Sequence, residues 1–217
     1  MATSGLGAWV VPKGGYRQTM TLPTDLYHLQ RVRWSVIAVQ RALIDQAYLS
    51  QPSRLDGAFG PMTAGAAAAF QKRNGLVADG WVGPATARRL FFRPVDDAQL
   101  ARSIPDNLLY GMARLESGMD PGAEGKVDDR DRGLFQFNRT YWPSITDEVA
   151  YADVTHCAKV AADSLRLAYD RLGRWDCAVA SHNNPSKART WATTGSPPDD
   201  QIANYVTAVT INANLPR

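Results

Sequence analysis

The feature that most constrains the fold is a short repeat in the first half of the chain. Residues 56–63 read Asp-Gly-Ala-Phe-Gly-Pro-Met-Thr, and residues 79–86 read Asp-Gly-Trp-Val-Gly-Pro-Ala-Thr. Each Asp-Gly pair predicts a tight turn with a residue at positive φ. Thr63 and Thr86 are predicted helix N-caps, because a threonine hydroxyl can accept a bond from the free N–H groups of a first helical turn. The repeat therefore predicts two units in which a turn leads into a helix.

Three helices are expected around the repeat. Upstream of it, apolar residues recur at steps of three and four, which indicates an amphipathic helix: Leu29, Val32, Val36, Val39, Leu43 and Ala47. Residues 64–74 are alanine-rich and stop at Gly75, a typical residue just beyond a helix end. Residues 87–92 form a shorter helix. Residues 28–92 are therefore expected to form one compact module.

This module resembles the peptidoglycan-binding module found on many cell-wall hydrolases. The resemblance covers residues 36–91 and is carried by the paired turns together with Val39-Gln40 and Phe70-Gln71. It implies non-catalytic anchoring to peptidoglycan. The positions that it marks for this role are Asp56, Gly57, Asp79, Gly80 and Trp81. The alternative is that these residues only build turns and helix caps, in which case the module can still bind sugar or stem peptide.

The second half of the chain is also predicted to be helical, so the fold class is all-α. Residues 104–217 are expected to form a catalytic domain that begins with a helix over 104–117, with Pro105 in its first turn. Residues 93–103 show little apolar periodicity and are predicted to be a linker. Residues 1–27 form an N-terminal extension to which no role is assigned.

One carboxylate stands out in the last turn of the helix predicted over 104–117. Helical spacing gives Glu116 the apolar neighbours Met112 and Ala113, and Gly118 ends the helix. Apolar surroundings and the negative end of the helix dipole both favour the protonated form of a carboxylic acid. A glycosidase needs such an acid to protonate the leaving oxygen. The alternative is an ordinary solvated glutamate at a helix end.

The residues that follow Glu116 resemble the goose-type lysozyme and lytic transglycosylase superfamily. That family has Glu-Ser at a helix end and then a Gly-Leu-Met-Gln block. Here Glu116-Ser117 is followed by Gly-Leu-Phe-Gln-Phe at 133–137. A third block at 180–185, Ala-Ser-His-Asn-Asn-Pro, stands where the family has Ala-x-Tyr-Asn-x-Gly, and Tyr205 begins a segment that resembles the family's late Tyr-x-x-x-Val.

The resemblance implies a lysozyme-like helical domain in which Glu116 is the general acid. Five further positions are implied to bind the sugar chain: Gln136, Asn138, His182, Asn183 and Tyr205. His182 replaces the tyrosine that the family places beside the acid. A histidine packed on an otherwise apolar helix stripe is the alternative for that residue.

The type of cleavage depends on a second carboxylate. Hydrolysis with inversion needs a base roughly 6.5–9.5 Å from the acid to activate water. Asp129-Arg130 resembles an Asp-Arg pair of goose-type lysozymes, so Asp129 is the predicted partner; Asp131 is the rival and Asp128 a third candidate. A solvated charged loop is the plainer interpretation. Family members that lack such a base let the muramic acid's own hydroxyl close an anhydro ring.

The predicted activity is therefore cleavage of the β-1,4 bond between N-acetylmuramic acid and N-acetylglucosamine, by a muramidase or a lytic transglycosylase. No metal or cofactor is expected. A zinc peptidase needs several ligands, and the histidines, His28, His156 and His182, form no paired motif. A calcium loop starting at Asp129 would need glutamate where Thr140 stands. A non-catalytic wall-binding or virion structural protein is the alternative from another class.

Charge and hydropathy exclude other partners. A net charge of +3 is too small to indicate nucleic-acid binding, and no apolar run approaches the roughly 20 residues that span a bilayer.

Cys157 and Cys177 are expected to be buried free thiols. The start of the chain does not read as a signal peptide. Because an anchor joined to a muramidase resembles a phage endolysin, a monomer held in the host cytoplasm until its release to the wall is expected.

Overall fold

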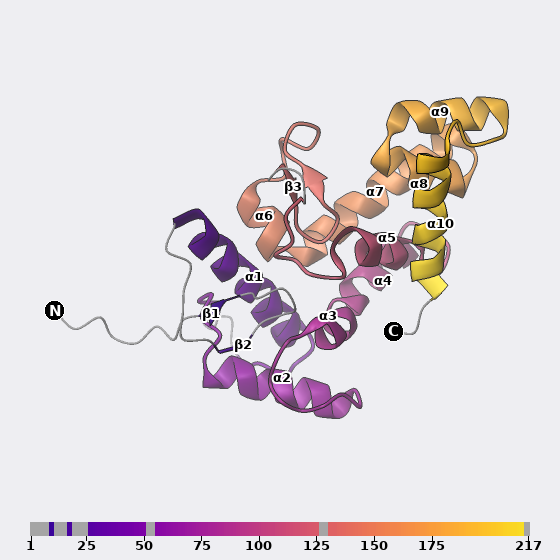
Figure 1. The fold of residues 1–217 in the computed structure, drawn as a ribbon. Helices are drawn as coiled ribbons and strands as arrows, with labels where there is room; N and C mark the ends of the chain where they lie inside the picture. The colour runs from indigo at the N-terminus through magenta and orange to yellow at the C-terminus, as the bar shows by residue number, and fades with distance from the viewer. Residues whose placement is uncertain (1–8, 11–16, 19–25, 51–54, 126–129, 215–217) are drawn as a thin grey trace. The chain divides into compact units, whose positions relative to one another are not determined.

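The computed structural model describes residues 9–10, 17–18, 26–50, 55–125 and 130–214. Within these ranges it contains ten helices and two antiparallel pairs of two-residue strands (Figure 1). One strand pair joins β1 (Trp9–Val10) to β2 (Arg17–Gln18), inside the extension that received no assignment from sequence. The predicted all-α class is confirmed, because strands this short form no layer of the fold.

The chain divides into two compact units. The first consists of Met1–Phe91 and Ser117–Val154, and the second of Phe92–Glu116 and Thr155–Arg217. The segment that follows the Glu-Ser motif thus shares a unit with the module predicted to bind peptidoglycan. This division follows packing and does not coincide with the domain boundaries expected from sequence, which stay a prediction.

The repeat lies between the three helices of the first unit. These helices are α1 (Leu26–Asp45), α2 (Pro61–Arg73) and α3 (Pro84–Leu90). The prediction that Thr63 and Thr86 are N-caps is wrong, because Gly60 and Gly83 occupy those positions. Proline is favoured in the first helical position, where it has no N–H to leave unbonded. Each helix therefore starts at its proline, and each threonine lies inside the first turn.

A second part of the first unit packs against α1. It contains β3 (Asp131–Arg132), β4 (Phe137–Asn138) and α6 (Asp147–Ala152). Trp34 of α1 stacks on Tyr151 of α6 with ring centroids 6.2 Å apart. A Cβ added at Gly133, which has a φ of 71°, would lie 2.2 Å from the carbonyl oxygen of Ala150. Only glycine fits that approach of the loop to α6.

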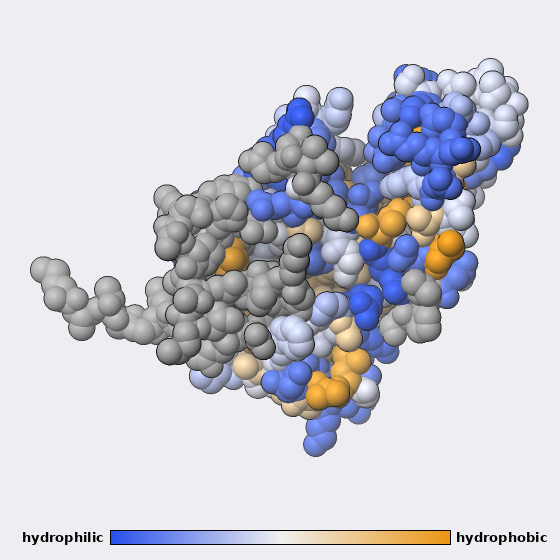
Figure 2. All heavy atoms as spheres, viewed as in Figure 1, coloured by the Kyte–Doolittle hydropathy of each residue, from blue (hydrophilic) through white to orange (hydrophobic). Residues whose placement is uncertain are grey.

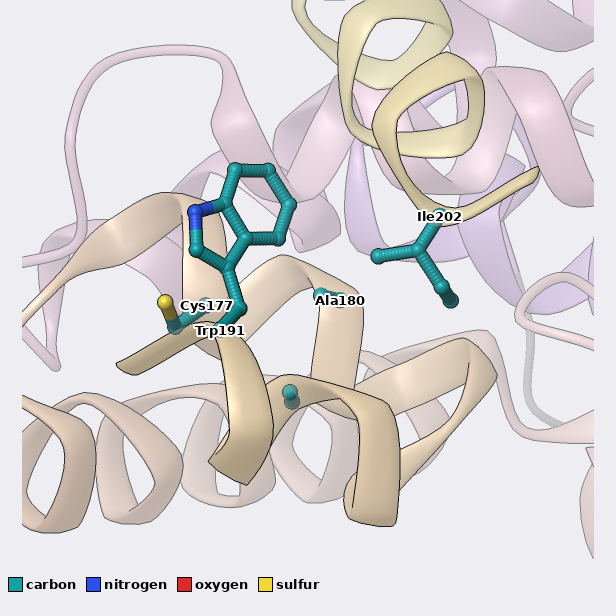
Figure 3. Packing of buried hydrophobic residues seen from close by; sticks show 5 residues of the cluster. Cys177, Ala180, Trp191 and Ile202 are labelled. Atoms are coloured by element: carbon teal, nitrogen blue, oxygen red, sulfur yellow. The ribbon is translucent and has the colours of Figure 1, made fainter. Parts of the chain in front are cut away.

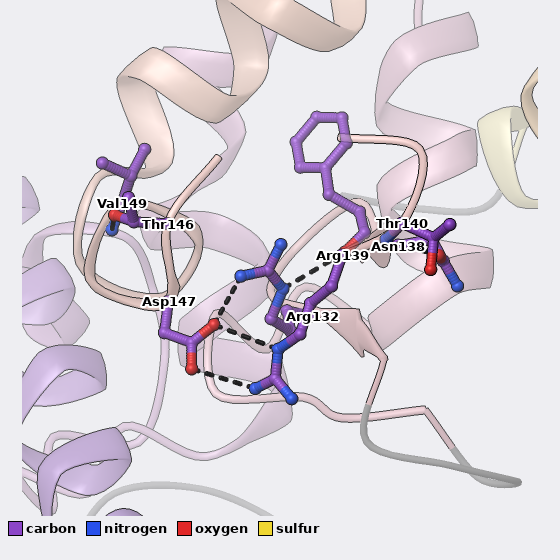
Figure 4. Close-up of polar contacts among 8 residues, drawn as sticks. Arg132, Asn138, Arg139, Thr140, Thr146, Asp147 and Val149 are labelled. Atoms are coloured by element: carbon purple, nitrogen blue, oxygen red, sulfur yellow. Dashed lines mark hydrogen bonds and ion pairs between the residues drawn. The ribbon is translucent and has the colours of Figure 1, made fainter. Parts of the chain in front are cut away.

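An ion-pair cluster fixes β3 to the start of α6. Arg132 has only 3% of its side chain exposed, and its guanidinium pairs with the carboxylate of Asp147. Arg139 reaches the same carboxylate with its Nη2 at 2.9 Å (Figure 4). Thr146 caps α6 by accepting a hydrogen bond from the N–H of Val149. A buried arginine needs such a partner, since an unpaired charge is costly to remove from water.

The second unit begins with a helix that the sequence did not predict. Residues expected to form a linker contain α4 (Phe92–Leu100), which buries Val95, Ala98 and Gln99 on one face. The next helix, α5 (Leu108–Ser117), starts four residues later than predicted, so Pro105 lies before it. Phe92 contacts Tyr110 of α5 edge-on, at 5.1 Å between ring centroids. Burial of this short face therefore stabilises a helix that the weak apolar periodicity of the segment did not predict.

Four more helices complete the second unit: α7 (Val154–Leu172), α8 (Trp175–Asn183), α9 (Pro185–Thr194) and α10 (Asp200–Asn214). Cys177 and Ala180 of α8, Trp191 of α9 and Ile202 of α10 meet in one buried cluster (Figure 3). Both cysteines are buried and free, as predicted. On the face drawn in Figure 2, hydrophobic residues form small islands among hydrophilic ones.

Candidate functional site

Glu116 lies in the last turn of α5, as the sequence predicted. The helix buries Leu109, Met112 and Ala113, so the carboxylate follows an apolar stripe. The side chain of Glu116 is 19% exposed. This group is therefore mostly covered by protein but keeps a route to solvent, which is what a proton donor to a bound substrate needs.

Tyr205 of α10 is the hydrogen-bonding partner of this carboxylate. Its hydroxyl donates to Oε1 of Glu116 at 2.6 Å. Burial, and then the charge of Glu116, raise the pKa of Tyr205 well above the usual value, so the hydroxyl stays protonated. The sequence resemblance marked Tyr205 as a sugar-binding residue; the structure places its hydroxyl on the acid instead.

Gly111 explains how α5 and α10 come close enough for this bond. A Cβ added there would lie 2.5 Å from the carbonyl oxygen of Val209 and 2.8 Å from the backbone nitrogen of Ala213. Val209 lies one turn after Tyr205 on α10. The absence of a side chain at Gly111 therefore sets the spacing of the two helices that carry Glu116 and Tyr205.

His182 of α8 lies near the same carboxylate oxygen, beside the candidate acid as the family resemblance implied. Its Nε2 is 3.8 Å from Oε1 of Glu116, and 10% of its side chain is exposed. A protonated His182 would attract the carboxylate. Asn183, the last residue of α8, is exposed, and its predicted contact with the sugar chain stays a prediction.

In the first unit, Gln136 and Asn138 hold their own loop together. Nε2 of Gln136 donates to the carbonyl oxygens of Gly133 at 2.9 Å and Ala123 at 3.2 Å. Nδ2 of Asn138 donates to Oδ1 of Asp131 at 2.8 Å. Both side chains therefore have a structural role in the loop. Their contacts with the sugar chain stay a prediction.

The candidate second carboxylates are placed unequally. Asp128 and Asp129 lie outside the described residues. Asp131 lies in β3 and accepts the bond from Asn138, so one of its oxygens is occupied. Ser117 donates to the carbonyl oxygen of Leu134 at 2.9 Å, a bond within the first unit.

A buried glutamine organises the first copy of the repeat. Nε2 of Gln40 donates to Oδ1 of Asp56 at 2.8 Å, to the carbonyl oxygen of Ala58 at 2.9 Å and to the hydroxyl of Thr63 at 3.2 Å. Its Oε1 accepts from the N–H of Gly57. Gln40 itself is 1% exposed, so its amide must find its hydrogen-bond partners within the protein.

Gln71 repeats the arrangement in the second copy. Its Nε2 donates to Asp79 at 2.9 Å, to the carbonyl oxygen of Trp81 at 2.8 Å and to Thr86 at 3.0 Å, and its Oε1 accepts from Gly80. Both glutamines were among the residues that carry the family resemblance, but nothing in the sequence indicated that each would bind every part of its turn. Asp56, Gly57, Asp79 and Gly80 therefore build turns, and their role in anchoring to peptidoglycan stays a prediction.

Across the described ranges, no group of three histidine, cysteine, aspartate or glutamate side chains is arranged to hold a metal ion. In the same part of the chain, no helix is both long and apolar enough to cross a bilayer.

Comparison with protein families assigns both halves of the chain. A model described as a putative peptidoglycan binding domain matches residues 34–90, and a model described as a transglycosylase SLT domain matches residues 93–203. A search among curated proteins gave no match. The first model includes both glutamine-centred turns, and the second includes Glu116 and His182.

Proposed function

Because the chain belongs to the transglycosylase SLT family and carries a peptidoglycan-binding domain, it is an enzyme that acts on peptidoglycan, and we propose that Glu116 is its general acid. The bond cut is the β-1,4 link between N-acetylmuramic acid and N-acetylglucosamine. The hydrogen bond of 2.6 Å from the Tyr205 hydroxyl to Oε1 of Glu116 supports the assignment of Glu116 as the acid.

The bond from Tyr205 fixes the orientation of the carboxyl group. With Oε1 held, Oε2 is the oxygen that delivers the proton to the glycosidic oxygen. As the proton is transferred, the bond from that oxygen to C1 of the muramic acid breaks, and N-acetylglucosamine leaves with a new hydroxyl. Positive charge then develops at C1, next to the carboxylate that Glu116 has become.

We propose that the muramic acid's own primary hydroxyl then attacks C1 and gives its proton to Glu116. This step closes an anhydro ring, restores the acid and consumes no water. One carboxylate serves both proton transfers, which fits the family of the chain. Inverting hydrolysis is the alternative, with Asp129 or Asp131 as the base; Asp131 already accepts a bond from Asn138.

We further propose that the protein is a phage endolysin that acts as a monomer and stays in the host cytoplasm until a membrane pore opens. An anchor joined to a glycan-cutting domain supports this role, since it suits an enzyme that works on an insoluble wall. Expression inside a bacterium tests the proposal: lysis should begin only when the inner membrane is permeabilised. Lysis without permeabilisation would contradict it.

Glu116→Gln tests the assigned acid. Glutamine keeps the size of the side chain and can still accept the bond from Tyr205, but it cannot donate a carboxylic proton. Turbidity clearing of purified sacculi should fall by about 10²-fold or more. Glu148→Gln, at an exposed position of α6, is the matched control and should clear sacculi at the wild-type rate. Equal rates for both variants would reject Glu116.

A further inference from the structure

The first copy of the repeat contains a pocket with a volume of about 100 Å³. Its walls include Leu49, Ala58, Pro61 and Met62, and Asp56 is also one of its lining residues. This volume corresponds to about three water molecules, since each occupies roughly 30 Å³ in the liquid. The pocket can therefore hold a group of a few heavy atoms, with apolar walls on several sides.

Asp56, one of the lining residues, has a carboxylate oxygen that the turn does not use. Its Oδ1 is used by the turn, which it joins to Gln40 and to the N–H of Ala58. Among the described residues, no hydrogen bond or ion pair involves its Oδ2. That oxygen can accept a bond from a ligand without disturbing the turn.

The two copies of the repeat differ at the position that opens the pocket. Ala58 and Trp81 are equivalent: the N–H of each bonds to the aspartate of its turn, and the carbonyl oxygen of each accepts from the buried glutamine. The first copy has a methyl group there and the second has an indole ring. Ala58 lines the pocket, so a larger side chain at this position would take up space beside Asp56.

We propose that this pocket binds a methyl-bearing amide group of peptidoglycan. The methyl would pack against the apolar walls, and the amide N–H would donate to Oδ2 of Asp56. Peptidoglycan presents such groups as the N-acetyl groups of its sugars and as the alanyl amides of its stem peptides. This inference rests on the proposed function only because it takes peptidoglycan as the ligand. It places the recognition of peptidoglycan in the first copy of the repeat.

Binding of the full-length chain to purified sacculi tests the pocket. All variants carry Glu116→Gln, so that the sacculi stay intact and binding is measured apart from cleavage. Ala58→Trp places in the first copy the residue that the second copy already holds, and it should lower affinity about tenfold. Ala78→Trp, at an exposed position of the same module, is the control and should bind within about twofold of the parent.

A matched pair of charge variants tests the role of Asp56. Asp56→Asn and Asp79→Asn each keep an oxygen that can accept the bonds of the turn, so both should fold with the parent's circular dichroism and melting temperature. Asp56→Asn should weaken binding several-fold, whereas Asp79→Asn should not. Equal binding by Ala58→Trp and Ala78→Trp, or equal losses for the two asparagine variants, would overturn the proposal.

Soluble competitors distinguish the two sources of the amide. Peptide-free N-acetylated glycan strands and free alanine-containing stem peptides are each added to the sacculus-bound protein. Displacement by the strands identifies an N-acetyl group, and displacement by the peptides identifies an alanyl amide. Displacement by neither would overturn the proposal. Release of soluble glycan by the Glu116→Gln parent would instead contradict the proposed function, so the two failures can be told apart.

Discussion

The hydroxyl of Tyr205 donates a hydrogen bond of 2.6 Å to Oε1 of Glu116. Tyr205 is in α10, the last helix of the second unit, and Glu116 is in the last turn of α5. The bond fixes one carboxyl oxygen of a side chain that is 19% exposed. A fixed orientation matters because proton transfer requires the donor oxygen to face the leaving group within hydrogen-bond distance.

Tyr205→Phe should slow the chemical step more than it weakens substrate binding. The variant keeps the aromatic ring but loses the hydroxyl that orients Glu116. We expect kcat to fall by about 10- to 100-fold while KM changes less than about threefold, since orientation of a catalytic group acts mainly in the transition state. Steady-state kinetics on soluble glycan strands measures both constants. An unchanged kcat would show that the bond has no part in catalysis.

The stabilising contribution of Tyr205 should depend on pH above 10. Burial and the charge of Glu116 raise the pKa of Tyr205 well above its usual value of 10.0. Below pH 10 the phenol is protonated in both folded and unfolded chains, so its contribution is fully present. As pH rises further, the unfolded chain ionises first, and the contribution is lost. The difference in unfolding free energy between wild type and Tyr205→Phe should therefore shrink above pH 10 in urea titrations; a difference that grows there would contradict this assignment.

Gly111→Ala should separate α5 from α10. The added Cβ would lie 2.5 Å from the carbonyl oxygen of Val209, so backbone must move. Overpacking of this kind costs about 1–3 kcal/mol, and the shift of α10 should also lower kcat by displacing Tyr205. Gly65→Ala in α2 is the control: its Cβ would meet open space, and the change should stabilise the protein by about 0.5–1 kcal/mol. Similar melting temperatures for both variants would argue against the close approach.

Asp147→Asn should destabilise the first unit. It leaves the guanidinium of Arg132, 3% exposed, without a charged partner. Removal of one partner from a buried ion pair costs about 3–5 kcal/mol, and the 29% exposure of Asp147 moves the expected loss to about 3 kcal/mol. Arg139→Gln, which removes the more exposed arginine of the cluster, should cost about 1 kcal/mol. Denaturant unfolding compares the two, and an equal loss would refute the special role of Arg132.

Features governed by local backbone chemistry could be predicted from sequence. Gly57 and Gly80 have φ values of 68° and 72°, as Asp-Gly turns require, and Gly75 has a φ of 69° just beyond α2. Glu116 lies in the last turn of its helix because the apolar stripe and Gly118 both mark that end. Each of these depends on a few neighbouring residues, so the pattern contains the necessary information.

Features that depend on distant partners could not be predicted in this way. Residues 93–103 have little periodicity, yet α4 forms there because a short face is buried within the second unit. Gln40 and Gln71 can be read from the sequence. That the polar groups of each turn bond to one of these glutamines cannot. The bond from Tyr205 depends on which face of α10 meets α5, and only packing decides that.

Mass spectrometry of glycan released from purified peptidoglycan tests the central claim most directly. The wild-type protein should yield fragments lighter by one water than hydrolytic products, which marks an anhydro end on N-acetylmuramic acid. Glu116→Gln should release none of them. Undiminished release by Glu116→Gln would contradict the assignment of Glu116 as the acid. Ordinary reducing ends on the wild-type products would show that the enzyme hydrolyses the bond and does not close an anhydro ring.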